Sequence, residues 1–352
     1  MEKICTLLDI SEKKTLSIVV PVYNEVNTIP LFQQRLKEAC ASLNLNLEVV
    51  YVNDGSQDDS LLILNELRKQ DPSIAIVDLS RNFGKEIALQ AGLDHAIGDA
   101  VVVMDVDLQD PPELIPEFIT HWQAGYDVVY ATRRSRSGEG WLKKSSAYFF
   151  YRLISKMSHV SIPKDTGDFR LLSRRAVDAL KLMREKHRFM KGLFSWIGFP
   201  QLAVPFERQA RLVGSTKWNY WKLLNLAIEG ITSFSIAPLK LATIMGFITA
   251  VCAFLYAIVI VYKTIAFGEP IQGYPSLMVV ILFLGGIQLI TLGIIGEYLG
   301  RTFDEAKQRP LYITKDYFPA LEFEDSFKSR ATKNAMISMT PCSLPAIAAV
   351  TK

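Results

Sequence analysis

Two long stretches without any charged residue constrain the fold of this chain most strongly. They are Leu241–Tyr262, with 22 residues, and Pro270–Gly296, with 27. About 20 apolar residues in a helix cross a bilayer, so each stretch is long enough to span one. The alternative is a pair of core helices in a soluble domain. Because 21% of the 352 residues are charged, the chain is not wholly embedded. The sequence predicts a water-exposed part joined to a two-helix membrane hairpin.

The distribution of basic residues around these stretches predicts their orientation. Basic residues precede the first stretch and follow the second, at Arg208, Arg211, Lys217, Lys222, Lys240, Arg301, Lys307 and Arg309. The loop between them holds only Lys263 and Glu269 as charged residues. By the positive-inside rule, both termini are cytoplasmic. The first fourteen residues, MEKICTLLDISEKK, lack the apolar core of a signal peptide. The net charge of +3 is modest, and no nucleic-acid partner is predicted.

Apolar runs alternate with amphipathic stretches from Leu16 to about Thr132. Strands are expected at Leu16–Val22, Leu47–Val52, Ile74–Leu79, Ala100–Met104 and Asp127–Ala131. Helical patterns lie between them, near 27–42, 58–70, 85–97 and 113–124. Repeated strand–helix units of this kind predict an α/β fold with a mainly parallel, doubly wound sheet.

Acidic residues collect where the fourth of these strands ends. In AVVVMDVDLQDPP, the apolar run is followed by Asp105, Asp107 and Asp110, and two prolines prevent the strand from continuing. Open α/β sheets bind ligands at the carboxyl ends of their strands. Hard oxygen ligands suit a divalent cation shared with nucleotide phosphates, whereas the alternative is an acidic turn that only ends a strand.

Two further polar motifs end the first and second strands and belong to the same crevice. They are PVYNE, at residues 21–25, and NDGS, at residues 53–56. Asp54 can accept hydrogen bonds from a base or ribose, Gly55 permits close backbone approach, and Ser56 can cap the next helix. A plain turn with a helix cap remains the alternative for NDGS. The chain has neither GxGxxG nor GxxxxGK[ST], which argues against a dinucleotide-dependent oxidoreductase and a P-loop NTPase.

Taken in order and spacing, PVYNE, VNDGS, SRNFGKE, MDVDLQDPP and TGDFR resemble family 2 glycosyltransferases with a GT-A fold. The closer resemblance is to polyprenyl-phosphate glycosyltransferases, which include dolichol-phosphate mannose synthases. TGDFRLLSRRAV, GSTKW and a hairpin ending in GEYLGR most resemble the GtrB-type bactoprenol glucosyl transferases. The resemblance runs from about Leu16 to Ile313.

The resemblance implies roles for residues on the donor side. Pro21, Tyr23, Glu25 and Asp54 fall at the positions that hold the base and ribose, and Arg81 and Lys85 fall near the nucleotide-sugar. Solvated charges at a helix start are the alternative for the last two. Asp105, Asp107 and Gln109 fall at the positions that hold the diphosphate and a metal, Mg²⁺ or Mn²⁺. Asp110 is expected to cap the helix that follows the two prolines.

On the acceptor side, the resemblance gives catalytic positions to Asp168 and Arg170 of TGDFR. In sugar transfer to an alcohol, such an aspartate acts as general base. A lipid phosphate is already anionic at neutral pH, with a second pKa of about 6 by analogy with phosphoserine. We therefore expect Asp168 to orient the substrates. Cations must then shield the acceptor phosphate from it, and the candidates are Arg170, Arg133, Lys144 and Lys217.

The implied reaction is inverting transfer of a hexosyl group, glucose from UDP-glucose, to undecaprenyl phosphate. It takes place on the cytoplasmic face of the bacterial inner membrane, in a multi-pass protein. The alternatives are GDP-mannose or a UDP-aminoarabinose derivative as donor, a processive polysaccharide synthase, and a non-catalytic membrane scaffold. A processive synthase normally carries a QxxRW motif and more spans, and neither is present.

The expected organisation has three parts. Residues 1–232 form the GT-A domain, with interfacial helices near 140–158 and 218–232, although packing of the first on the domain is an alternative. Residues 233–300 hold membrane helices near 238–262 and 274–297, and residues 301–352 form a cytoplasmic tail with a disordered end. Two thin spans with interfacial helices are compatible with a homo-oligomer.

Overall fold

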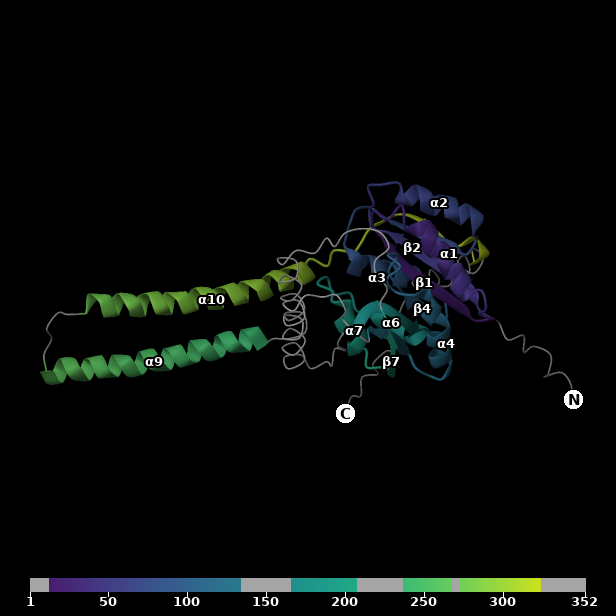
Figure 1. Cartoon of the computed structure of the whole chain (residues 1–352). Helices are drawn as coiled ribbons and strands as arrows, with labels where there is room; N and C mark the ends of the chain where they lie inside the picture. The colour runs from purple at the N-terminus through teal and green to yellow at the C-terminus, as the bar shows by residue number, and fades with distance from the viewer. Residues whose placement is uncertain (1–12, 134–165, 208–236, 268–272, 324–352) are drawn as a thin grey trace, which may run out of the picture.

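The computed structural model describes residues 13–133, 166–207, 237–267 and 273–323. An α/β domain occupies one end of the molecule, and two long helices project from one side of it (Figure 1). The interfacial helices expected near 140–158 and 218–232 lie outside the described residues, as do Lys144 and Lys217.

Within the described ranges the sheet has eight strands in the order β7-β5-β6-β4-β1-β2-β3-β8. Their bounds are β1 Thr15–Val22, β2 Asn46–Asn53, β3 Ile74–Leu79, β4 Ala100–Val103, β5 Val128–Arg133, β6 Thr166–Ser173, β7 Gln201–Phe206 and β8 Thr314–Phe318. The five strands expected from the sequence are confirmed. β1 pairs in parallel with β2 and β4, and β2 with β3, so their carboxyl ends meet at one edge. β6 runs antiparallel to β4 and β5, which brings its first residues to the same edge.

Helices cover both faces of this sheet. One core contains apolar side chains of α1 (Ile29–Cys40), α2 (Ser60–Gln70) and α4 (Ile115–Gln123). The other contains those of α3 (Lys85–His95), α6 (Arg174–Leu182) and α7 (Met190–Trp196). Successive strand residues point to opposite faces, and in β1 Ile18 and Val20 join the first core whereas Val19 joins the second. The predicted doubly wound α/β architecture is confirmed.

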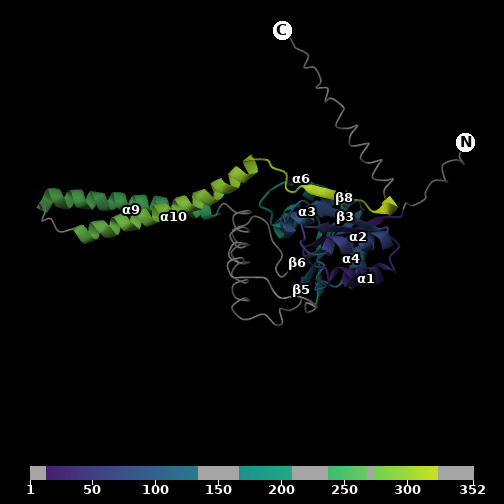
Figure 2. The same cartoon turned by 90° about the horizontal axis from the view of Figure 1, so that it is seen from above.

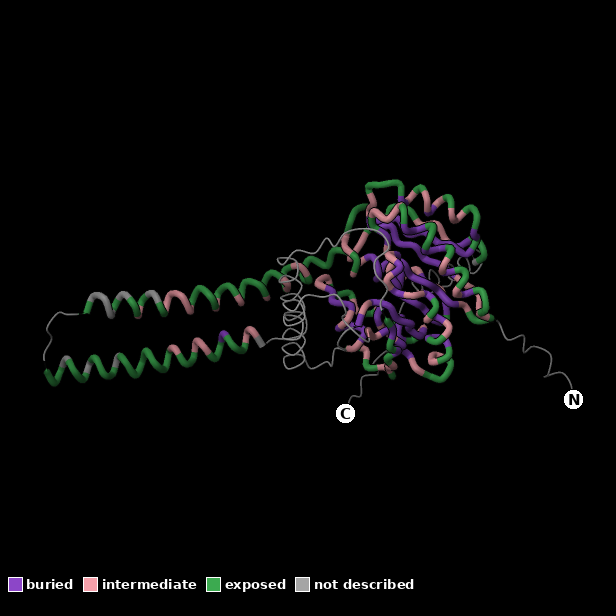
Figure 3. The backbone as a smooth tube through the Cα atoms, in the orientation of Figure 1, coloured by how far each residue is buried: buried purple, intermediate pink, exposed green. Residues whose placement is uncertain are grey.

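The two apolar stretches form α9 (Ala237–Phe267) and α10 (Tyr274–Ala306), which pack side by side as a hairpin. In the most apolar window of each helix no residue is buried, which excludes the core-helix alternative for this structure (Figure 3). Both helices continue beyond the expected ends at 262 and 297. In α10 an i,i+4 ion pair between Glu297 and Arg301, 3.1 Å long, lies in this extension.

The segment expected to form the C-terminal tail, residues 301–352, begins with regular structure that no sequence pattern predicted. Its end, expected to be disordered, lies outside the described residues. β8 pairs antiparallel with β3 and forms the edge of the sheet, and the short helix η2 (Leu321–Phe323) follows it. Figure 2 shows β8 beside β3. The sequence signal was weak because TKDYF is a five-residue edge strand with only two aromatic residues to mark it.

Candidate active site

The loops after β1 and β2 are interlocked by hydrogen bonds. The Asn24 amide donates to Ser56 Oγ over 3.1 Å, and the Gln57 amide donates to Asn24 Oδ1 over 2.8 Å. Asn24 is held in the left-handed region, with φ of 55°. The PVYNE and NDGS loops are therefore joined into one surface at the carboxyl ends of β1 and β2. Ser56 does not cap α2, contrary to expectation, because the residue at that cap is Asp59.

Asp54 and Gly55 hold the loop that leads into α3. Both carboxylate oxygens of buried Asp54 accept backbone bonds, from the Phe83 amide at 2.7 Å and the Gly84 amide at 3.0 Å. Burial raises the pKa of Asp54 although these bonds oppose it. Gly55 has φ of 65°, and a Cβ there would lie 2.4 Å from the carbonyl carbon of Arg81. A carboxylate oxygen can accept a second bond, so a base or ribose contact stays a prediction for Asp54.

Three of the other donor-side residues belong to the PVYNE loop, and the fourth, Arg81, lies in the loop next to Gly55. Pro21 and Glu25 are half-buried and Tyr23 is exposed. The Arg81 guanidinium stacks 4.1 Å above the Phe83 ring and donates to a neighbouring backbone carbonyl. Contacts of these residues with a nucleotide-sugar stay predictions.

Lys85 joins the two halves of the expected site. As the first residue of α3, it places Nζ 2.7 Å from a carboxylate oxygen of Asp105 and 2.6 Å from Asp168 Oδ2. Its side chain is 41% exposed, whereas that of Asp168 is 10% exposed. Partial burial alone would lower the pKa of Lys85, but the two carboxylates outweigh it and raise the pKa. The alternative of a merely solvated helix-start charge is therefore wrong for Lys85.

Asp168 is held as a carboxylate. Its burial would raise its pKa, but the charges of Lys85 and Lys191 and the bond from Lys85 outweigh burial and lower the pKa well below the usual range. Asp168 Oδ1 is buried and has no hydrogen-bond partner among the described residues. A carboxylate with so low a pKa is a weak proton acceptor, and its open oxygen can accept a bond from a bound substrate.

Arg170 holds the backbone on either side of Asp168 through hydrogen bonds. It is 4% exposed, and its guanidinium donates to the Gly167 carbonyl at 2.9 Å and the Asp168 carbonyl at 3.3 Å. The guanidinium also lies 3.8 Å from the centre of the Phe194 ring. Burial lowers the pKa of Arg170 to about 10. This geometry favours positioning of the backbone at Asp168, and a direct catalytic contact stays a prediction.

The loop after β4 carries the expected metal ligands. Asp105 binds Lys85, and Asp107 Oδ1 accepts from the Gln109 amide at 3.2 Å across Leu108, whose φ is 57°. Among the described residues, no three His, Cys, Asp or Glu side chains gather as a metal site. The donor set still fits Mg²⁺ or Mn²⁺ in kind, since it offers two carboxylates and the Gln109 amide oxygen.

A capping contact by Asp110, which is buried, stays a prediction. The residues at the N-caps of η1 (Pro112–Leu114) and α4 are Pro111 and Leu114, and neither cap has a side-chain bond.

Two charged residues near Asp168 were missed by the sequence reasoning. Glu86 Oε2 accepts from the Met190 amide at 2.9 Å, and burial together with the charge of Asp168 raises the pKa of Glu86 to about 7. Lys191 acts on both acids through its charge. Glu86 lies within SRNFGKE and was available as a signal, whereas Lys191 belongs to none of the quoted motifs.

The proposed contacts with the lipid phosphate are only partly within the described structure. Arg133 is the last residue of β5 and is half-buried opposite Phe206 of β7. Its contact with the acceptor, like those of Lys144 and Lys217, stays a prediction.

Comparison with known proteins places this geometry in a family. Residues 17–181 match glycosyl transferase family 2, and residues 237–302 match the GtrB C-terminal hairpin. An uncharacterized glycosyltransferase of Synechocystis is 53% identical over 86% of this chain and 95% of its own length. The bactoprenol glucosyl transferase of Shigella phage SfV is 50% identical over 86% of this chain and 98% of its own.

A solved glucosyl-3-phosphoglycerate synthase from Mycobacterium tuberculosis, in complex with Mn²⁺, UDP-glucose and phosphoglyceric acid, overlaps only partly. It is 18% identical, with a TM-score of 0.43 over 62% of this chain and 78% of its own. The extent of the sequence matches is decisive: the chain is a member of glycosyl transferase family 2, with the GT-A fold, and carries the GtrB C-terminal hairpin.

Proposed function

We propose that this enzyme transfers a glucosyl group from UDP-glucose to undecaprenyl phosphate on the cytoplasmic face of the bacterial inner membrane. The observation that carries the proposal is the placement of Lys85 between Asp105, at the expected diphosphate position, and Asp168, at the expected acceptor position. The similarity to bactoprenol glucosyl transferases over nearly their whole length supports the substrate class.

The reaction is an in-line displacement. An oxygen of the lipid phosphate attacks the anomeric carbon, the bond from that carbon to the diphosphate oxygen breaks, and UDP leaves with the bonding electrons. The configuration inverts, which gives a β-linked polyprenyl-phosphate glucose. No proton needs to be removed, because the attacking phosphate is already anionic at neutral pH.

Asp168 orients the sugar, and Lys85 compensates the negative charge around it. The open Oδ1 of Asp168 accepts a bond from a sugar hydroxyl, and its low pKa keeps it from acting as a general base. Lys85 offsets the repulsion between this carboxylate and the arriving phosphate. When bound at Asp105, Asp107 and Gln109, Mg²⁺ or Mn²⁺ supplies Lewis-acid stabilisation of the leaving diphosphate.

The α9–α10 hairpin gives the domain its place at the membrane. The acceptor phosphate lies at the headgroup level because its polyprenyl chain is buried in lipid. In α10 the apolar run ends at Gly296, and charged Glu297 and Arg301 follow at the level where headgroups begin. We propose two spans with both termini in the cytoplasm, which puts the crevice on the side where nucleotide-sugars occur.

The test uses the purified full-length protein, undecaprenyl phosphate and radiolabelled nucleotide-sugars. We expect a chloroform-soluble product with UDP-glucose, abolished by EDTA and restored by excess Mg²⁺ or Mn²⁺. GDP-mannose and a UDP-aminoarabinose derivative, assayed in parallel, identify the donor. Absence of a lipid product with every nucleotide-sugar would refute the proposed function. Activity unchanged by EDTA would refute the dependence on a divalent metal.

Asp168→Asn tests the orienting role. A general base contributes about 10²–10⁴-fold to the rate, and its titration would give the pH–rate profile an acid limb with the pKa of a carboxylate. We expect the variant to lose activity while keeping the shape of the wild-type profile. A profile whose acid limb disappears in Asp168→Asn would instead assign general-base catalysis.

A further inference from the structure

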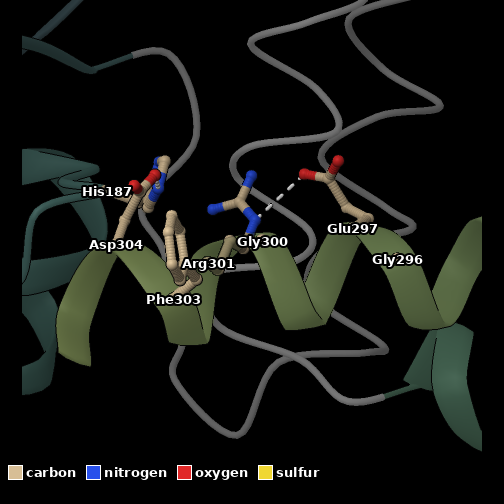
Figure 4. A pocket seen from close by; sticks show the side chains of 7 residues that line it. All are labelled: His187, Gly296, Glu297, Gly300, Arg301, Phe303 and Asp304. Carbon is tan, nitrogen blue, oxygen red and sulfur yellow. Dashed lines mark hydrogen bonds and ion pairs between the residues drawn. The ribbon is translucent and has the colours of Figure 1, made fainter. Parts of the chain in front are cut away.

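The loop between α6 and α7 carries a network of polar contacts that the chemistry does not use. At its membrane side it binds the last turn of α10. The Lys186 amide donates to Glu305 Oε1 at 2.7 Å, and His187 Nε2 lies 3.1 Å from Asp304 Oδ2. The Lys186 ammonium also donates to the Asp304 carbonyl. Figure 4 shows His187 against Asp304 at the end of an open pocket along α10.

The same loop then binds the helix that carries Lys85. Arg188, which is 3% exposed, donates to Gln90 Oε1 of α3 at 2.7 Å and to the Met183 carbonyl at 2.7 Å. Two residues later, the Met190 amide donates to Glu86 Oε2 in the first turn of α3. Residues 186–190 therefore link the cytoplasmic end of a membrane helix to the helix that begins at Lys85.

The covalent connection gives α10 a second point of attachment to the same domain. After α10 the chain turns at Gln308, whose φ is 46°, and enters β8 beside β3. The Tyr312 hydroxyl donates to Asp94 Oδ2, near the end of α3, at 2.9 Å. One flexible connection leaves the angle between hairpin and domain free, whereas a second contact at Asp304 and Glu305 restricts it.

These contacts are too exposed to add much to stability. The side chains of His187 and Asp304 are 35% and 47% exposed. Exposed ion pairs contribute about 0–1 kcal/mol, so their removal leaves the fold intact. Orientation is more sensitive than stability, because a misplacement of about 1 Å can cost about 100-fold in rate.

We propose that Lys186, His187, Asp304 and Glu305 are positioning residues for the membrane-bound acceptor. They hold the crevice at the height and angle at which a phosphate anchored in the bilayer reaches Lys85 and Asp168. The proposal rests on the proposed function, because it needs an acceptor whose depth is fixed by lipid. An acceptor free in solution can approach the crevice from any direction and does not need these contacts.

The experiment compares two acceptors in the full-length protein. One is undecaprenyl phosphate in phosphatidylethanolamine–phosphatidylglycerol vesicles, and the other is a water-soluble ten-carbon isoprenyl phosphate. We expect D304A/E305A to lower kcat/KM at least tenfold for the vesicle-bound acceptor, mainly through KM. For the soluble acceptor and for the nucleotide-sugar, we expect changes below twofold.

The matched control is E113A/E117A in η1 and α4. Glu117 pairs with His121 at 3.8 Å, with exposures of 51% and 33% that resemble those of Asp304 and His187. Glu113 pairs with Arg35 at 2.7 Å and is also exposed. Figure 1 shows α1 and α4 on the far side of the domain from α10, and we expect this variant to match the wild type with both acceptors.

The outcomes separate the two proposals. Equal losses with both acceptors, or no loss with the vesicle-bound one, would overturn the positioning role. A loss in the E113A/E117A control equal to that in D304A/E305A would also overturn it. Retained activity on the soluble acceptor shows that D304A/E305A is folded. If the wild type makes no product with either acceptor, the proposed function fails, and the positioning role fails with it.

Discussion

The two ends of α3 carry similar charged residues in different surroundings. At the first end, Lys85 binds Asp105 and Asp168, Glu86 senses the charge of Asp168, and the pKa values of Lys85, Glu86 and Asp168 are shifted. At the other end, Asp94 pairs with Arg184 at 2.6 Å, and the Arg184 side chain is 54% exposed. The acids at the two ends are similarly shielded, since the side chains of Asp168 and Asp94 are 10% and 12% exposed. The ends differ in the number of acids around one base, because Lys85 binds two carboxylates and Arg184 pairs with one.

The largest expected effect follows from Lys85→Ala. The variant leaves Asp105 and Asp168 facing the phosphates without the intervening cation, and we expect kcat to fall about 10²–10³-fold, as for other preorganised electrostatic groups. Single-turnover transfer to undecaprenyl phosphate measures it. Lys37→Ala, which breaks a 2.8 Å pair between the exposed Lys37 ammonium and the buried Asp71, is the matched control and should remain within twofold. Near-wild-type rates in Lys85→Ala would show that the charged residues at the first end of α3 are no more important for transfer than those at its other end.

The second prediction concerns the loop at residues 81–84, which leads into α3 at Lys85. In Gly55→Ala, the new Cβ would lie 2.4 Å from a backbone carbon at Arg81 and force the loop away from Asp54. Overpacking costs about 1–3 kcal/mol, and the positive φ adds about 1 kcal/mol. Gly125→Ala is the control, because φ is also positive there, at 101°, but no atom lies within 4 Å. We expect a larger fall in Tm for Gly55→Ala, and equal falls would contradict the close approach.

The third prediction concerns the pH dependence of stability at the first end of α3, tested by Glu86→Gln. The pKa of Glu86 is raised from 4.5 to about 7, so the folded protein binds more protons than the unfolded chain between these values. Glu86 therefore costs stability as pH rises through this window. Glutamine keeps an oxygen for the Met190 amide but cannot ionise. We expect the Tm of Glu86→Gln relative to wild type to be higher at pH 8 than at pH 5.

Glu66→Gln on the exposed face of α2 serves as the control for this pH effect, and we expect its Tm difference to change much less between the two pH values. A relative Tm of Glu86→Gln that falls with pH would mean that Lys85 and Lys191 stabilise the ionised Glu86 more than burial opposes it.

The smallest effect is expected at the other end of α3. Arg184→Ala removes an ion pair between an exposed guanidinium and the largely buried Asp94, and pairs with one exposed partner contribute about 1 kcal/mol. Thermal unfolding should shift by no more than a few degrees, and transfer to a soluble acceptor should be unchanged. A large loss of activity on that acceptor would show that the charges at this end also reach the chemistry.

Much of the architecture was predictable because it depends on local patterns. Five strands, the helices between them and the hairpin follow from apolar periodicity, and the acidic loop at 105–110 follows from a strand ended by prolines. The expectation that Ser56 caps a helix was wrong, and β8 was not predicted. Each concerned a polar or short segment whose partner lies far away in the chain, as Asn24 does for Ser56 and β3 does for β8.

The sequence by itself determined the strand–helix alternation, the apolar helical hairpin and the acidic residues at the strand ends. Only the tertiary structure decided that Lys85 meets Asp168, 83 residues later, and that residues 186–190 bridge α10 and α3. The physical reason is that periodicity records which face of an element is buried. Which charged groups share a crevice depends on strand order, and here the antiparallel pairing of β6 with β4 brings Asp168 to the edge where Lys85 lies.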